Sequence, residues 1–335
     1  MTAVPERPVV RVTNLRAWYA TRQFGVQREV RAVDDVSLSV MPDEIYGLAG
    51  ESSCGKSTLI KTIAGAIRPP LAVRSGSVEF DFNGQRLDLY RAPPAARAAI
   101  RWKHLSYVMQ GSMGVLNPVR RVQCSFVDFA QRHLGQPMPQ FLDTVRSHLA
   151  RVQLEPDVLR AYPHELSGGM RQRVAIALAT VCRPELVIAD EPTTALDVIV
   201  QRGVLDMIRE IQRELKTSLI FVTHDMAVHA HLCHRLGVMY AGRLIEEART
   251  ADIFRTPRHP YTTHLIASLP RIGQAAPTTA LEGAPPNLAD PPAGCRFHPR
   301  CPLAMDVCRQ RVPALTEVAP GHRVACFAVT PPTAP

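Results

Sequence analysis

Short runs of consecutive apolar residues alternate along the chain with segments whose apolar residues repeat at helical spacing. The apolar runs are Ile45–Ala49, Leu186–Ala189 and the segment 218–222, SLIFV. Continuous runs of this length are typical of strands buried on both faces of a parallel sheet. The segment 204–215, VLDMIREIQREL, places its apolar residues on one stripe, which predicts a helix packed on a core with its charges in solvent. The pattern therefore predicts an α/β protein.

The composition is that of a folded protein of two or three domains, with 335 residues of which 46% are apolar. No run of 18 or more apolar residues occurs, and the start MTAVPERPVVRV lacks the layout of a signal peptide, so we expect neither a membrane span nor export. The net charge of +9 comes mainly from scattered arginines, so we expect no nucleic-acid partner. In a reducing cytosol the eight cysteines are not expected to form structural disulfides.

A glycine-rich segment follows the first apolar run and precedes a helical pattern. Gly50, Gly55, Lys56 and Ser57 match G-x-x-x-x-G-K-[ST], the loop whose backbone N–H groups surround phosphates at a helix N-terminus. In this loop Lys56 would reach the β- and γ-phosphates, and the Ser57 hydroxyl would be a ligand of Mg²⁺. Ser53 is a departure, because a positive φ at a residue other than glycine costs about 1 kcal/mol. The segment predicts a nucleotide-binding site.

Two adjacent carboxylates, Asp190 and Glu191, end the second apolar run. Charged groups at the end of a buried strand are costly unless they have a function. Asp190 fits the role of holding Mg²⁺ through water, and Glu191 that of orienting or deprotonating the attacking water. His224 follows the third run and is either a contact to the γ-phosphate or a structural histidine. These residues predict nucleotide hydrolysis.

The segment ELSGGMRQRVAIALA contains the signature sequence of the ATP-binding cassette (ABC) family, carried by Leu166, Ser167, Gly168, Gly169 and Gln172. Together with the phosphate loop, YVMQ, the acidic pair, ALD at 195–197 and His224, it makes the chain resemble this family over residues 10–255. The resemblance implies a RecA-like P-loop core with an antiparallel β subdomain and a helical subdomain. It also implies that two cassettes close head-to-tail over two ATP molecules, so that Ser167 faces a phosphate held by the opposite subunit.

The resemblance assigns roles to further residues. It implies that Gln110 connects Mg²⁺ and the attacking water to the helical subdomain, that His224 is the switch histidine, and that Tyr19 stacks on adenine. Trp18 is the alternative, but the alternation along NLRAWY places Tyr19 on the face of Leu15 and favours it. The expected nucleotide-binding residues are Tyr19, Gly50, Glu51, Ser52, Ser53, Cys54, Gly55, Lys56, Ser57, Thr58, Asp190, Ser167, Gly168 and Gly169, with Glu191, His224 and Gln110 catalytic and Ser57 and Gln110 as Mg²⁺ ligands.

Three segments are similar to those of ATPase subunits in the peptide and nickel importer group: SMGVLNP after Gln110, YPHELSGGMRQR, and HPYTTHLIASLP at 259–270. This resemblance implies a second ATPase subunit, a paralogue in a heterodimer, two transmembrane permease subunits and, indirectly, an extracytoplasmic substrate-binding protein. It places the chain at the cytoplasmic face of the inner membrane as a peripheral subunit. Two residues depart from the pattern, since Ser53 replaces a common glycine and Gly111 an acidic residue, but neither is a catalytic group.

We therefore expect an ATP-hydrolysing subunit that energises an importer of dipeptides or oligopeptides. Oligosaccharides and nickel are alternative cargoes, because similar ATPases serve those importers. A soluble ABC ATPase of ribosomes or DNA repair is an alternative of a different class, and a redox protein is a third. The chain has one phosphate loop and one signature, which argues against the soluble class because its members usually join two cassettes.

The expected domain organisation is an ATP-binding core in residues 1–110 and 167–255, a helical subdomain in 111–166 and a C-terminal extension in 256–335. The proline-rich segment 271–293 is predicted to be an extended linker rather than a packed element. Few large apolar residues follow position 290, so we expect the extension to need cross-links because it cannot bury a core of its own.

Four cysteines near the end of the chain, Cys295, Cys301, Cys308 and Cys326, have the spacing C-x5-C-x6-C-x17-C. Four thiolates suit tetrahedral zinc or an iron–sulfur cluster. Structural zinc sites usually contain a pair of ligands two to four residues apart, and these separations are larger. The extension also resembles that of peptide-importer ATPases, which implies a [4Fe-4S] cluster on the four cysteines with a structural role. Zinc is the alternative.

Overall fold

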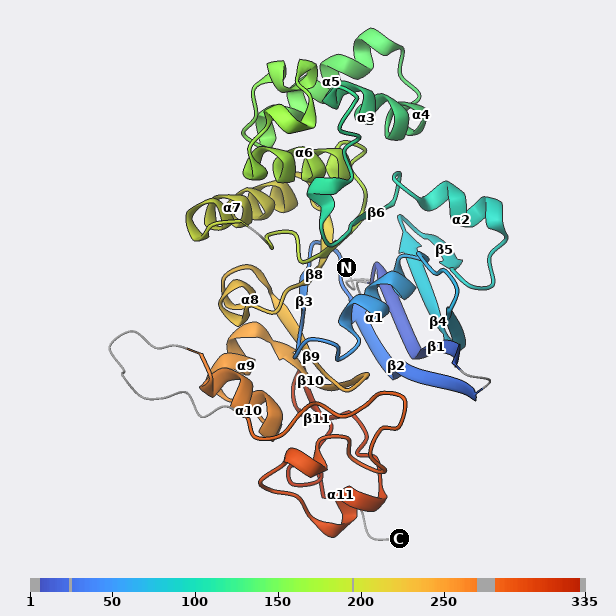
Figure 1. The fold of residues 1–335 in the computed structure, drawn as a ribbon, viewed down its shortest axis with the longest axis vertical. Coiled ribbons are helices and arrows are strands. Elements are labelled where there is room, and N and C mark those ends of the chain that lie inside the picture. Colours follow the sequence, from blue (N-terminus) through green and yellow to red (C-terminus); the bar gives the residue numbers. More distant parts are fainter. Residues whose placement is uncertain (1–6, 24–25, 195, 270–280, 332–335) are drawn as a thin grey trace, which may run out of the picture. The chain divides into compact units, whose positions relative to one another are not determined.

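The computed structural model describes residues 7–23, 26–194, 196–269 and 281–331 (Figure 1). The chain forms two compact units that interleave along the sequence. The first unit contains Met1–Val10, Val40–Ile45 and Glu79–Phe221, and the second contains Arg11–Ser39, Tyr46–Val78 and Val222–Pro335. No helix among the described residues is both long enough and apolar enough to cross a membrane.

The second unit is built on two sheets. In one sheet, β3 (Ile45–Ala49) runs parallel to β9 (Arg235–Tyr240), and β10 (Arg243–Arg249), β12 (His322–Val324) and β11 (Thr316–Ala319) follow as antiparallel neighbours. In the other, β1 (Val10–Gln23) lies between β2 (Val26–Val40) and β4 (Leu71–Phe82). The helices of this unit are α1 (Lys56–Ile63), α8 (Met226–Leu232), α9 (Thr250–Arg255), α10 (Pro260–Ala267) and α11 (Asp306–Gln310).

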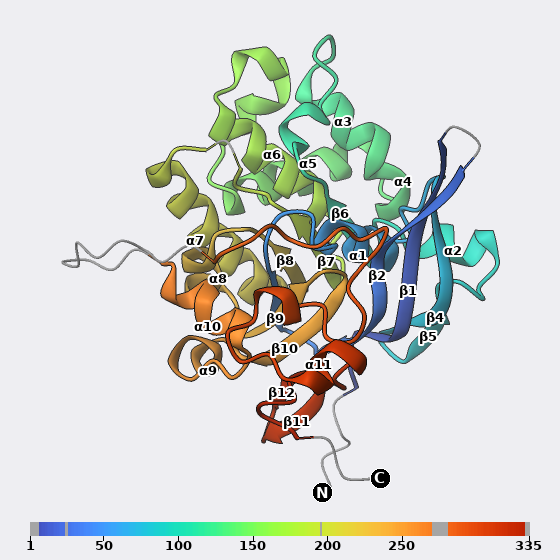
Figure 2. The same ribbon diagram turned by 60° about the horizontal axis from the view of Figure 1, so that its bottom comes forward.

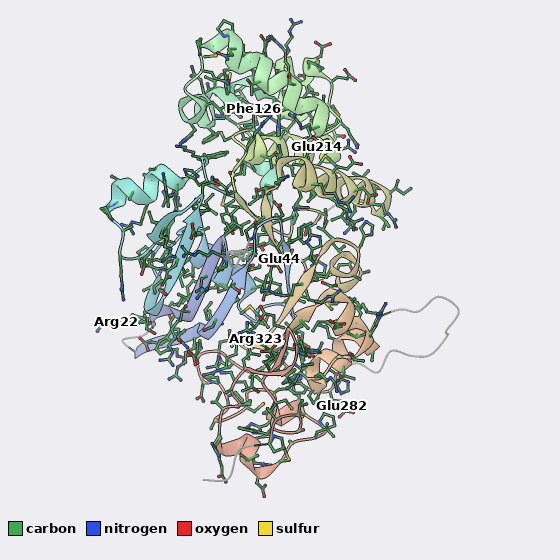
Figure 3. All side chains as sticks on the ribbon, turned by 180° about the vertical axis from the view of Figure 1, so that it is seen from behind. Arg22, Glu44, Phe126, Glu214, Glu282 and Arg323 are labelled. Carbon is green, nitrogen blue, oxygen red and sulfur yellow. The ribbon has the colours of Figure 1, made fainter. Side chains whose placement is uncertain are left out.

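The first unit combines a short parallel sheet with a group of helices. Strand β7 (Leu186–Asp190) lies between β6 (Leu105–Val108) and β8 (Ser218–Val222), and β5 (Gln85–Asp88) pairs with the end of β4. The helices are α2 (Pro94–Ile100), α3 (Val122–Phe129), α4 (Gln131–Leu134), α5 (Met138–Arg151), α6 (Gly168–Thr180) and α7 (Val198–Leu215), with short 3₁₀ turns at 112–114, 156–160 and 163–165. Residues 111–166 contain helices and no strand. Phe126 of α3 is fully buried (Figure 3).

The structure confirms the α/β class and the three strands predicted from apolar runs. The helix expected at 204–215 is also present, but it begins six residues earlier, at Val198, where the Asp197 carboxylate accepts a hydrogen bond from Val200 N at 2.9 Å. Val198 and Ile199 are 80% and 85% exposed. They lie off the buried stripe, so hydrophobic periodicity could not find this first turn.

The structure corrects two expectations about the C-terminal extension. Residues 281–293 form no helix or strand, but Leu281 and Leu288 pack against a core cluster of the second unit, so this part is not a free linker. Residues 271–280 lie outside the described residues. The extension also shares a core, because Phe297 and Val324 are 1% and 0% exposed and β12 joins the sheet at β10 (Figure 2). The extension buries its few apolar residues against strands that precede it in the sequence.

Candidate functional site

The predicted phosphate loop connects β3 to α1 in the second unit. Gly50, Ser53 and Gly55 have φ values of 141°, 64° and 108°. A Cβ on Gly50 would lie 2.2 Å from Met239 O, and one on Gly55 would lie 2.0 Å from Ala32 O, so the path admits only glycine at both positions. The expected strain at Ser53 is confirmed, because this serine adopts the left-handed conformation in a loop of fixed shape.

Lys56 folds back onto the loop that precedes it. Its Nζ donates to the backbone oxygens of Gly50 and Glu51 at 2.6 and 2.9 Å and lies 3.7 Å from Cys54 Sγ. The side chain is only 6% exposed. Burial raises the pKa of Cys54, although the nearby Lys56 lowers it, so the thiol stays neutral. The loop therefore holds one buried cation, whose carbonyl partners phosphate oxygens could replace.

The two candidates for adenine stacking have different surroundings. The Tyr19 hydroxyl lies 3.1 Å from Thr58 Oγ1, which places it beside the helix that follows the loop. The Trp18 ring is approached by two guanidinium groups, those of Arg31 and Arg74, at 5.1 and 5.8 Å from the ring centroid. Tyr19 therefore lies next to the phosphate loop, while the Trp18 ring carries cation contacts. The stacking role itself stays a prediction.

The predicted carboxylates and the predicted glutamine meet in the first unit. Gln110 Nε2 donates to Glu191 Oε2 at 3.0 Å, and Thr194 Oγ1 donates to the same oxygen at 3.1 Å. Glu191 follows β7 with a φ of 47°, a strained conformation that turns the chain at the end of the strand. Asp190 is 1% exposed and accepts from Tyr107 Oη at 3.4 Å. The arrangement fixes the Glu191 carboxylate and leaves it accessible, as water activation requires.

The signature segment begins helix α6. Ser167 is its N-cap, is exposed, and accepts a hydrogen bond from Met170 N at 3.2 Å. Gln172 is 2% exposed, and its Oε1 accepts from Ser112 Oγ at 3.1 Å, which ties this helix to the segment after Gln110. Sequence reasoning missed this contact. The exposed N-terminus of α6 offers amide N–H groups and the positive end of the helix dipole to an anion.

The other departure from the family pattern, Gly111, has a structural account, and His224 is held by its neighbours. Gly111 has a φ of 70°, and an added Cβ would meet nothing within 4 Å, so glycine is favoured there by conformation rather than by space. His224 lies between β8 and α8 and is exposed, and Asp225 caps α8 by accepting from Ala227 N at 2.8 Å. The cap fixes the backbone next to His224. Its catalytic role stays a prediction.

The structure adds two residues to the phosphate loop that the sequence had not assigned. Tyr261 Oη accepts a hydrogen bond from Glu51 N at 2.8 Å, and Arg300 forms an ion pair with the Glu51 carboxylate. Tyr261 belongs to the HPY segment, which the sequence marked only as typical of one group. Arg300 belongs to no recognisable motif, so only the tertiary structure could place it at the loop.

The four terminal cysteines gather at one place in the second unit. Cys295 N donates to Cys308 O at 2.8 Å. Burial, and then the charges of Cys308, Cys326 and Cys301, raise the pKa of Cys295 to about 11. Among the described residues, however, no three or more His, Cys, Asp or Glu side chains have the spacing of a ready metal site. The thiols are therefore close neighbours that do not adopt ligand geometry here.

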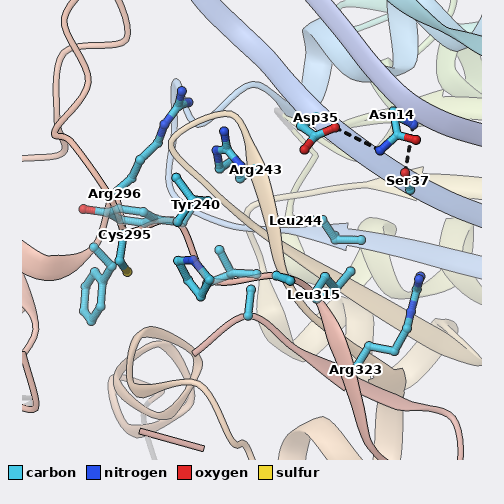
Figure 4. Close-up of a pocket in the computed structure, with 17 residues that line it drawn as sticks. Asn14, Asp35, Ser37, Tyr240, Arg243, Leu244, Cys295, Arg296, Leu315 and Arg323 are labelled. Atoms are coloured by element: carbon cyan, nitrogen blue, oxygen red, sulfur yellow. Dashed lines mark hydrogen bonds between the residues drawn. The ribbon is translucent and has the colours of Figure 1, made fainter. Parts of the chain in front are cut away.

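A cavity of about 450 Å³ lies in the second unit beside Cys295 and Arg296 (Figure 4). On its wall, Asn14 Nδ2 donates to Asp35 Oδ1 at 3.0 Å. Arg243 and Arg296 also line it, and both form ion pairs with Asp34. No residue of the phosphate loop belongs to its lining as described, so it is separate from the loop.

Two family models match the chain. Residues 33–194 match the model described as ABC transporter. Residues 245–308 match the model described as oligopeptide/dipeptide transporter, C-terminal region. Together they cover both the phosphate-loop segment and the part of the chain that contains the HPY segment and the first three terminal cysteines.

Similar proteins span nearly the whole chain. It is 37% identical over 321 residues to the dipeptide transport ATP-binding protein DppD of Caldanaerobacter subterraneus, an alignment that covers 95% of this chain and 96% of that protein. It is 36% identical over 333 residues to the oligopeptide transport ATP-binding protein AppF of Bacillus subtilis, with 97% and 99% covered. Among solved structures, it resembles a dimeric structure of the bacterial ABC transporter cassette MJ0796, with a TM-score of 0.60, 23% identity, and 72% of this chain and 98% of that one covered.

Proposed function

The chain belongs to the ABC transporter family of ATPases, and from this premise we propose that it energises an importer of dipeptides or oligopeptides. The observation that carries the proposal is the match of residues 245–308 to the oligopeptide/dipeptide transporter C-terminal region, which extends beyond the ATPase segment. The relatives named for dipeptide and oligopeptide transport support the same cargo class over nearly full length. Oligosaccharide or nickel import is the competing assignment.

In the second unit, we assign the triphosphate to the loop Gly50–Thr58. Its glycines allow the backbone N–H groups to surround the phosphates. Lys56 would replace its hydrogen bonds to the carbonyl oxygens of Gly50 and Glu51 with hydrogen bonds to phosphate oxygens. Ser57 would supply one hydroxyl ligand to Mg²⁺, which when bound neutralises charge on the phosphates. Tyr19 is the proposed adenine contact, because it is anchored to Thr58 at the start of α1.

In the first unit, we assign water activation to Glu191. The hydrogen bond from Gln110 orients the carboxylate, whose proposed role is to accept a proton from the attacking water. Gln110 and Asp190 have the oxygen donors that Mg²⁺ prefers, the latter acting through water. His224, from the second unit, is the proposed contact to the γ-phosphate, and Ser167 with its two following glycines is proposed to serve a phosphate on the partner cassette.

The test of the catalytic assignment is Glu191→Gln. We expect ATP hydrolysis to fall on the order of 10²-fold or more with ATP binding retained, because the amide cannot accept the proton but the phosphate loop is unchanged. The matched control is Glu210→Gln, an exposed carboxylate of α7, which should keep wild-type turnover. Near-normal hydrolysis in the Glu191 variant would remove this residue from the mechanism.

The partners we propose are a paralogous ATPase subunit, two transmembrane permease subunits and, indirectly, an extracytoplasmic substrate-binding protein, with the chain peripheral at the cytoplasmic face of the inner membrane. Residues 111–166 would receive a permease, residues 1–110 and 167–255 would form the ATPase core, and residues 256–335 the extension. Reconstitution with the permeases and binding protein tests the cargo. Stimulation of ATP hydrolysis by dipeptides or oligopeptides supports the proposal, and stimulation only by nickel or oligosaccharides would overturn the cargo class.

We also propose that Cys295, Cys301, Cys308 and Cys326 hold a [4Fe-4S] cluster. Four thiols are a donor set that suits such a cluster, and Cys295 lies close enough to the other three for their charges to raise its pKa, although no three of these side chains are placed for a metal ion among the described residues. The cluster would cross-link the extension. Anaerobic protein should contain about four irons per chain, lost in Cys301→Ser and kept in the core control Cys182→Ser. Stoichiometric zinc without iron would exclude the cluster and retain a four-cysteine metal site.

A further inference from the structure

Glu51, the second residue of the phosphate loop, is held by two side chains from the C-terminal part of the chain. Arg300 Nη1 donates to Glu51 Oε2 at 2.9 Å and Arg300 Nη2 donates to Oε1 at 3.1 Å, a two-pronged pair. Tyr261 Oη accepts from Glu51 N at 2.8 Å. One loop residue is thus fixed through both its side chain and its backbone.

Arg300 is held in place by further hydrogen bonds of its guanidinium group. Its Nε donates to Glu282 O at 3.1 Å, and its Nη1 also approaches Tyr240 Oη at 3.3 Å (Glu282 is labelled in Figure 3). The side chain is 6% exposed. Exposed ion pairs contribute little because both side chains must be ordered, whereas here the arginine is already ordered by other contacts. The pair is therefore preorganised.

Tyr261 is fixed by aromatic packing. Its ring centroid lies 4.7 Å from that of Tyr240 and 5.6 Å from that of Phe297, and the Tyr261 side chain is 1% exposed. Tyr240 also contacts Phe297 edge-on at 5.2 Å. Since Tyr240 touches Arg300 as well, one aromatic cluster supports both contacts to Glu51.

We propose that Arg300 and Tyr261 are positioning residues for ATP binding. A free carboxylate on the phosphate loop would repel a triphosphate, which carries the same sign of charge. Arg300 neutralises the Glu51 carboxylate and fixes its orientation. Tyr261 holds the backbone of Glu51, whose carbonyl oxygen accepts a hydrogen bond from Lys56. The C-terminal extension thereby becomes part of the nucleotide site. The inference rests on the proposed ATP site.

The experiment uses the full chain and measures binding of a fluorescently labelled ATP together with KM and kcat for hydrolysis in the assembled complex. Arg300→Gln should weaken ATP binding and raise KM about tenfold, with kcat changed by less than about twofold, since charge repulsion acts on binding rather than on water activation. The double variant Glu51→Gln/Arg300→Gln should recover most of the affinity, because no unpaired carboxylate remains. Tyr261→Phe keeps the ring and should raise KM about threefold.

The controls separate this inference from the proposed function. Arg309→Gln, an exposed arginine of the same extension, should leave KM unchanged. If Lys56→Ala does not reduce ATP binding, the proposed ATP site is wrong. If Lys56→Ala abolishes binding while Arg300→Gln and Tyr261→Phe bind like wild type, only the positioning role is overturned. If the double variant is as weak as Arg300→Gln, the contact acts through structure alone and the electrostatic inference is overturned.

Discussion

Glu246 of β10 is the buried carboxylate that attaches the HPY segment and β12 to the core of the second unit. It is 0% exposed and accepts hydrogen bonds from Arg258 N at 2.7 Å, His259 N at 2.9 Å and His322 Nε2 at 2.7 Å. Glu246→Leu has a similar volume but removes the acceptor. We expect it to destabilise the protein and to loosen the start of α10.

The magnitude follows from the groups left behind. Three donors lose their acceptor, two of them on the buried residues His259 and His322, and each buried unsatisfied group costs about 1–3 kcal/mol. Removing one side of a buried charged network costs about 3–5 kcal/mol in total, because the remaining partners are left unpaired and relief of the carboxylate's own desolvation penalty offsets only part of that loss. We therefore expect a loss of about 3–5 kcal/mol in the free energy of unfolding. This is a large part of the 5–15 kcal/mol that is typical of a folded protein.

Urea unfolding followed by circular dichroism measures this loss, with Glu317→Leu as the matched control. Glu317 lies on β11, which is separated from β10 by β12 in the same sheet, is exposed, and accepts from Gly321 N at 2.8 Å. Its replacement should change the free energy of unfolding by less than about 1 kcal/mol. A loss below about 1 kcal/mol in Glu246→Leu would refute the reasoning, because it would mean that the three donors find other partners.

The remaining predictions concern the N-terminus of α6, the phosphate loop and the buried histidines. Ser167→Arg should reduce hydrolysis in the assembled complex at least about tenfold while ATP binding to the chain's own loop persists, since the cation blocks the N-terminus of α6; a proportional loss of both functions would contradict the composite site. Gly55→Ala should abolish ATP binding and destabilise the fold by about 2 kcal/mol or more, measured by nucleotide titration and urea unfolding, because its Cβ would lie 2.0 Å from a backbone oxygen. Burial lowers the pKa of His259 to about 3 and those of His148 and His229 to about 4, helped for His148 by nearby arginines. Only the unfolded chain then takes up these protons near pH 6.5, so stability should fall between pH 7 and pH 5 by about 2 kcal/mol for each histidine, and an unchanged urea midpoint would contradict this.

The sequence alone determined the local chemistry of the proposed nucleotide site. Gly50, Gly55 and Lys56 are fixed by spacing, because a loop that wraps phosphates needs glycine where φ is positive and a lysine at the start of the helix. The apolar runs before this loop and before Asp190 likewise identified their strands, since a strand buried on both faces has no polar alternation. These features depend on neighbours in the chain and can be read from it.

Only the tertiary structure decided which distant residues support the site. Arg300 reaches Glu51 across 249 residues of sequence, and Glu246 joins His322 across 76. Neither contact leaves a periodic pattern, because a single polar side chain is placed by the folding of other elements rather than by its own neighbours. For the same reason, the small number of apolar residues in the extension predicted that it could not form a core of its own. In the structure Phe297 and Val324 are buried, and β12 pairs with β10, a strand that precedes the extension. A shared core is a property of packing between segments, and composition within one segment cannot reveal it.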